Sequence, residues 1–160
     1  MALDQRPAGR LTHTEALPLK EQLTRFGMRQ PACRALVESH YGIGGLLAVA
    51  VWSELGDSRR FSRSQQAVRH SGLDVTVDAS DLRRAHGFLS RQGPATLRWA
   101  LFEAAHNASR HGSPDHDYYT MVKNRHDGKL AAISVARQFA RRCYHILRNL
   151  DPDVVYTIPS

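Results

Sequence analysis

The apolar positions of this chain recur mostly at helical spacing. Near the C-terminal end they follow one another at intervals of three and four residues: Ile133, Ala136, Ala140, Cys143, Leu147 and Leu150. A second series with this spacing follows Pro94: Leu97, Leu101, Ala104 and Ala108. Residues three and four apart lie on one face of an α-helix, so each series predicts a helix with one buried stripe.

The N-terminal half predicts four more helices. An amphipathic helix begins at Thr14 and ends near Gly27, and Pro31 suits the first turn of a helix that reaches His40. Residues 46–55 are apolar on most sides, which indicates a central, buried helix that Gly56 ends. A short helix starts after Ser62 or Ser64, which are suitable caps, and ends at the Ser71-Gly72 pair.

The helical spacing breaks between residues 73 and 89. Val75 and Val77 alternate with polar residues, as in a short strand, and a return segment leads through Arg83 to Phe88. Ser113-Pro114 then opens a further section, with Tyr118, Met121 and Val122 on its inner face. We therefore expect a mainly α domain at 14–150 with one small β-hairpin, a disordered tail at 1–13 and a C-terminal tail at 151–160.

A glycine-rich turn separates two of the predicted helices and forms a helix-hairpin-helix-like element. Gly42 and Gly44 can adopt positive φ angles, which other residues rarely take, and they have no Cβ to keep a ligand away from the backbone. Gly45 then starts the next helix, whose N–H groups and dipole favour an anion such as a phosphate. The alternative is structural, because any antiparallel helix pair needs a turn.

The charge balance favours an acidic partner. The net charge is +7, and most of the 22 basic residues are arginine, which suits bidentate phosphate contacts. A genome rich in G and C would also enrich arginine, so this signal is weaker than it looks. Trp52 and Trp99 lie within predicted helices and are interpreted as core residues, not as base-stacking platforms.

The remaining composition argues against several classes of protein. Cys33 and Cys143 are far apart on apolar helix faces, so they read as buried thiols of a reducing compartment. No metal-ligand spacing appears among the nine histidines, and no metal site is predicted. A membrane span and a signal peptide are both absent, so we expect a cytoplasmic protein with no membrane partner.

Ser80 is the candidate for nucleophilic chemistry. It lies in Asp78-Ala79-Ser80-Asp81, close to Arg83 and Arg84. A hydroxyl attacks a phosphodiester only when its alkoxide is stabilised, and arginines also stabilise the charge that develops on phosphoryl oxygens. The alternative is a polar turn, since no activating base is evident nearby.

Taken in order, the motifs resemble a known family. They are the Tyr-Gly-Ile-Gly turn, Trp-Ser-Glu-Leu-Gly-Asp, Arg-Arg-Phe-Ser-Arg-Ser, Ser-Gly-Leu-Asp, and Leu-Ser-Arg-Gln-Gly-Pro-Ala-Thr-Leu-Arg-Trp-Ala-Leu. This series is similar to the C-terminal domain of bacterial insertion-sequence transposases related to the Piv/MooV DNA invertases, the IS-one-ten and IS-one-sixteen group. The resemblance covers roughly residues 36–150.

The resemblance implies roles for particular residues. In that family a serine nucleophile precedes an arginine-rich return segment, and Ser80 takes this position, seven residues before Gly87. Arg91 and Arg98 take phosphate-facing positions, and the family's glycine turn falls on Gly42 and Gly44. The chain departs from the family at Asp81, where glycine is usual, and this places an acid beside the nucleophile.

The resemblance also implies partners. Family members carry an N-terminal RuvC-like domain with acidic ligands for a divalent metal, and they recombine DNA under direction of a structured RNA. The residues before Thr14 are too few for such a domain. We therefore expect a DNA-binding C-terminal portion without its own cofactor, inactive alone, whose partners are DNA, a guide RNA, and a RuvC-like chain or a second copy.

Two other readings stay open at this stage. In the first, the chain is a nucleic-acid-binding helix-hairpin-helix module without catalytic activity. In the second, it is a protein-interaction domain or a remnant with no present function. Asp81 and the missing metal-binding half favour the last of these.

Overall fold

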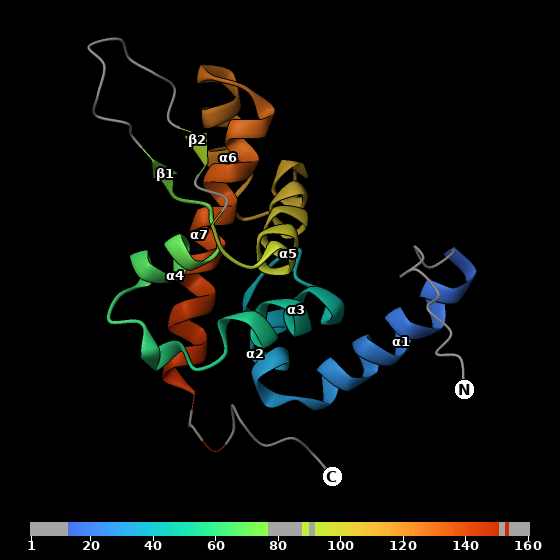
Figure 1. Ribbon diagram of the computed structural model, residues 1–160. Helices are drawn as coiled ribbons and strands as arrows, with labels where there is room; N and C mark the ends of the chain where they lie inside the picture. The colour runs from blue at the N-terminus through green and yellow to red at the C-terminus, as the bar shows by residue number, and fades with distance from the viewer. Residues whose placement is uncertain (1–12, 77–87, 90–91, 151–152, 154–160) are drawn as a thin grey trace, which may run out of the picture.

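A computed structural model describes residues 13–76, 88–89, 92–150 and 153 of the chain, shown in Figure 1. The elements, in chain order, are α1 (His13–Arg29), α2 (Pro31–Ser39), α3 (Gly45–Leu55), the 3-10 turn η1 (Ser58–Arg60), α4 (Ser64–His70), β1 (Val75–Thr76), β2 (Phe88–Leu89), α5 (Ala95–His106), the 3-10 turn η2 (Asn107–Ser109), α6 (His116–Arg125) and α7 (Gly128–Asn149). The mainly helical fold class is confirmed.

Local sequence explains where several helices begin and end. Pro31 occupies the first turn of α2, where its missing N–H is not needed. Gly56 ends α3 with a φ of 52°, and its N–H donates to Trp52 O. Asp127 caps α7 by accepting a hydrogen bond of 2.7 Å from the backbone N–H of Leu130.

The core forms where the predicted stripes of α5 and α7 meet. All four residues of the α5 series are buried, and so are those of the α7 series except Leu150, which is half-buried. Helix α7 packs against α4, α5 and α6, while α3 packs against α5 on the side away from α6. Helix α5 packs on both α3 and α7, and α7 also contacts α2 and α3 directly.

Helix α1 packs on the rest of the molecule through two glycines. A Cβ on Gly27 would collide with Val49 of α3, and a Cβ on Gly45 would lie 2.9 Å from Thr24 Cγ2 of α1. The glycines therefore allow a close crossing of α1 and α3. Beyond this crossing the N-terminal part of α1 extends outward in Figure 1, and its large apolar side chains are exposed at Leu17, Leu19 and Leu23.

The expected β-hairpin is not supported as such. The described residues contain only a two-residue antiparallel pair, in which Val75 lies opposite Leu89 and Thr76 opposite Phe88. Residues 77–87, which would form the rest of a hairpin, lie outside the described residues. The tail predicted at 1–13 is likewise outside them, apart from His13, which begins α1.

The prediction for the inner face of α6 was wrong at Met121. No residue of α6 is fully buried, and Met121 is 42% exposed. Asp115 occupies the N-cap position of this helix, but its side chain makes no capping hydrogen bond. Its buried carboxylate instead accepts two hydrogen bonds, of 2.7 and 2.8 Å, from the Arg142 guanidinium of α7.

Candidate nucleic-acid interface

The turn between α2 and α3 packs against the C-terminal end of α5. Gly42 has a φ of +93°, in the left-handed region, and a Cβ there would lie 2.9 Å from Ala104 O. The Asn107 side chain donates a hydrogen bond of 3.3 Å to Gly42 O. Both observations explain why glycine occupies this position, because a side chain would push the turn away from α5.

Gly44 and Gly45 lie in different surroundings. Gly44 has an extended backbone, with φ −90° and ψ 174°, and a Cβ on it would meet nothing within 4 Å. It is the N-cap of α3 but carries no side chain to accept from the first-turn N–H groups. Gly45 faces α1, so close packing already accounts for its lack of a side chain.

A hollow of about 350 Å³ opens beside this turn. It is lined by Tyr41, Gly42, Ile43, Gly44, Asn107 and Arg110. The Arg110 side chain is exposed and makes no ion pair with any residue in the described part of the chain. Backbone N–H groups at a helix start and a guanidinium together provide donors that a phosphate requires. The Asn107 amide instead positions the turn, because its Nδ2 donates to Gly42 O and Glu103 O.

Sequence reasoning missed Asn107 and Arg110. They lie more than sixty residues from the glycine turn along the chain, and Asn107 reaches it only because α5 packs on α3. A local motif contains no information about such a contact. The one usable signal was that the polar residues Asn107, Ser109 and Arg110 surround Ala108, the last residue of the α5 stripe.

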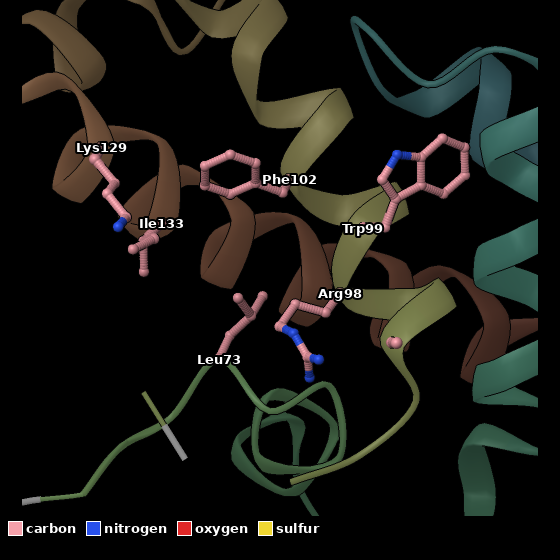
Figure 2. Close-up of a pocket in the computed structure, with 7 residues that line it drawn as sticks. Leu73, Arg98, Trp99, Phe102, Lys129 and Ile133 are labelled. Carbon is pink, nitrogen blue, oxygen red and sulfur yellow. The ribbon is translucent and has the colours of Figure 1, made fainter. Parts of the chain in front are cut away.

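A second hollow, of about 360 Å³, lies near the other end of α5. It is lined by Leu73, Ala95, Arg98, Trp99, Phe102, Lys129 and Ile133. Figure 2 shows Trp99 and Lys129 at opposite sides of this hollow, with Phe102 and Ile133 between them. Leu73 is two residues before β1, so the hollow adjoins the paired strands at the ends of segment 77–87.

The interpretation of Trp99 as a core residue was wrong. Its side chain is 46% exposed at the edge of the second hollow, whereas Trp52 is half-buried beside the Phe26 ring. On α5 the buried stripe occupies the opposite face, which is filled by Leu97, Leu101 and Ala104. Helical spacing alone therefore places Trp99 outward, since it is two residues from both leucines.

Most of the other predicted site residues lie outside the described residues. These are Ser80, Arg83, Arg84 and Arg91. Arg98, in the first turn of α5, lines the second hollow. Arg98 and Asn107 are nine residues apart on α5 and η2, which corresponds to about 14 Å along a helix axis. The two hollows are thus separate sites, spaced by about four base pairs of a duplex.

Many of the arginines serve the fold. Side chains that donate to backbone carbonyl groups belong to Arg34, Arg59, Arg60, Arg137 and Arg148. Arg69 and Arg142 pair with Asp74 and Asp115. The number of arginines therefore overstates how many guanidinium groups are available for hydrogen bonds to a ligand.

The cysteines are buried thiols, as predicted. Both are free, and burial raises the pKa of Cys33 to about 11 and that of Cys143 to about 12. At neutral pH they remain protonated and unreactive. Within the described residues, no group of three or more potential ligands is placed to hold a metal ion, and no helix has the length and hydropathy of a membrane span.

Comparison with known proteins shows what this chain is similar to. Residues 34–120 match the family described as Transposase IS116/IS110/IS902. The chain is also 28% identical over 142 residues to the transposase for insertion sequence element IS1111A of Coxiella burnetii (strain RSA 493 / Nine Mile phase I). That match covers 87% of this chain and 36% of the relative, so the chain spans about a third of the relative's length.

The family match takes in all residues that line the first hollow and those of the second except Lys129 and Ile133. It contains Gly42, Gly44, Arg98 and Arg110, as well as Ser80. It also covers more than half of the 160 residues. The chain therefore belongs to the IS116/IS110/IS902 family of transposases.

Proposed function

We propose that this chain is the DNA-binding C-terminal portion of an insertion-sequence transposase, acting in DNA transposition. The observation that carries this proposal is the hollow at the glycine turn, where the uncapped start of α3 lies beside Arg110 and Asn107. Because the chain belongs to a transposase family, we take the phosphates of the DNA backbone as the ligand of this site.

The physical argument rests on the start of α3. Its first N–H groups have no side-chain acceptor, and a phosphate oxygen near Gly44 would accept from them and gain from the helix dipole. The glycine exposes no Cβ, so a phosphate approaches the backbone closely. Arg110 supplies a charge-assisted hydrogen bond on the same side.

In this proposal, the chemistry is carried out by the segment that follows β1 and precedes β2 in the sequence. Ser80 is the nucleophile, and Arg83, Arg84, Arg91 and Arg98 bind the phosphates around it. A RuvC-like domain or partner chain supplies the divalent metal, so this chain alone binds DNA but does not recombine it. A guide RNA and a second copy of the chain are further partners of the assembled enzyme.

The binding part of the proposal is tested by Gly44→Asp. Aspartate is a favoured N-cap, and the open space around Gly44 accommodates it, so the melting temperature should stay equal or rise. The same carboxylate occupies the phosphate position and repels DNA. We expect duplex affinity, measured by fluorescence anisotropy at low salt, to fall about tenfold or more.

Gly44→Ser is the matched control, because serine caps the helix without adding charge. It should retain most of the duplex affinity. Equal affinity of Gly44→Asp and the original chain would remove the glycine turn from the interface, and no duplex binding by the original chain at low salt would end the proposal.

The catalytic part needs the metal-bearing half to be present. In a reconstituted transposition assay, Ser80→Ala should abolish strand transfer and the covalent serine–DNA adduct while leaving duplex affinity unchanged. Normal strand transfer by this variant would leave a binding module without a catalytic serine.

A further inference from the structure

One side of α5 carries three aromatic rings in line. Trp99, Phe102 and His106 are spaced by three and four residues, so they lie within one narrow sector of the helix. The Phe102 and His106 rings are in contact, with centroids 4.5 Å apart in an edge-to-face arrangement. We call these three residues the aromatic strip.

The strip lies on the outer side of α5. Trp99 is 46% exposed, Phe102 is half-buried and His106 is exposed, while Leu97 and Leu101 face the core. Large exposed aromatic side chains in line are costly to leave in water, and they commonly mark a binding surface. The strip extends over about 10 Å of helix axis, from the second hollow toward the glycine turn.

Positive charge accompanies the strip at its first ring. Lys129 and Arg98 line the same hollow as Trp99 and Phe102, and Figure 2 places their side chains on two sides of it. Lys129 is exposed and forms no ion pair with the residues that the structure describes. Aromatic faces beside cations are the combination that binds single-stranded nucleic acid, because bases stack on the rings and phosphates contact the cations.

We propose that the aromatic strip of α5 stacks unpaired nucleobases of a DNA or RNA strand, with Lys129 at the adjoining phosphates. This inference rests on the proposed function and adds its ligand class, an unpaired strand. At about 3.4 Å per stacked base, the strip has room for about three bases. The glycine turn, at the far end of α5, contacts phosphates of a duplex, so paired and unpaired regions would lie next to one another.

The test compares Trp99→Ala with the original chain on three labelled probes: a short oligothymidylate, an oligouridylate of equal length, and a blunt duplex. Loss of one stacking ring should weaken single-strand binding about tenfold. Duplex affinity should change less than twofold. Trp99→Phe should keep most of the single-strand affinity, and the two single-strand probes distinguish DNA from RNA as the preferred ligand.

Two further variants test the inference through a signal other than a loss of affinity. Trp52→Phe leaves Trp99 as the single tryptophan, so stacking should quench its fluorescence when oligothymidylate is added. Glu103→Gln removes the one carboxylate of α5, and it should strengthen single-strand binding, which misfolding does not explain. Met121→Ala, which removes an exposed apolar side chain from α6, is the matched control and should change nothing.

Unchanged single-strand affinity of Trp99→Ala, or no quenching of Trp99, overturns the inference. If duplex binding persists in that case, the proposed function survives. Failure of the original chain to bind any of the three probes at low salt removes both. Self-association that depends on Trp99, without single-strand binding, would make the strip a protein contact.

Discussion

His40 is a buried histidine at the start of the glycine turn, and its environment favours the neutral ring. Its Nδ1 lies 3.2 Å from Leu36 O, which assigns the proton of the neutral form to Nδ1. Its Nε2 is buried without a hydrogen-bond partner, and the ring packs edge-on against Phe139. A proton added at Nε2 would therefore have no acceptor.

Burial lowers the pKa of His40, although the Leu36 carbonyl opposes this shift, and Arg142 and Asp115 act on it in opposite directions. The unfolded chain takes up this proton near pH 6.5, and the folded chain takes it up at lower pH. Between these values the unfolded state binds more protons. Folding stability should therefore fall as the pH decreases below about 6.5, by at most about 1.4 kcal/mol per pH unit from this group.

Urea unfolding at about pH 7.5 and about pH 5.5 measures this effect. In His40→Leu the free energy of unfolding should depend less on pH than in the original chain, whatever its absolute value. His145→Leu, at an exposed position of α7, is the control and should keep the original dependence. The same pH dependence in His40→Leu would show that other groups account for the acid sensitivity.

At the scale of elements, periodicity is enough to place α5 and α7. The stripes of α5 and α7 became the core because residues three and four apart must share a face, whatever packs against them. The turn at Gly42 was also visible, since a tight turn needs glycine locally. Such features depend on neighbours within one or two helical turns.

Contacts between distant elements were not predictable in this way. Asp115 is a helix-start acid by its local sequence, but its carboxylate pairs with Arg142, on a different helix. Asn107 and Arg110 reach the glycine turn for a similar reason. Trp99 was assigned to the core because aromatic residues in helices are often buried, although its position relative to Leu97 and Leu101 indicates the opposite face. The predicted catalytic segment around Ser80 lies outside the described residues, so its role stays a prediction.

At the scale of the whole molecule, fewer guanidinium groups are available for phosphate hydrogen bonds than the number of arginines suggests. Arginines such as Arg59 and Arg148 donate hydrogen bonds to backbone carbonyls of segments distant in the sequence, and they stabilise the fold in this way. The cations assigned to duplex DNA by the proposed function are five: Arg83, Arg84, Arg91, Arg98 and Arg110. Each phosphate that is neutralised releases about 0.9 counterion.

The logarithm of the duplex association constant should therefore fall with the logarithm of salt concentration with a slope of about −4.5. Arg110→Gln should make this slope shallower by about one, because one phosphate contact is lost. Arg148→Gln is the control with the same charge change: its guanidinium donates to Phe61 O near the C-terminal end of α7, away from both hollows. Equal slopes for Arg110→Gln and Arg148→Gln would mean that duplex binding follows the total charge of the chain and not the surface beside the glycine turn.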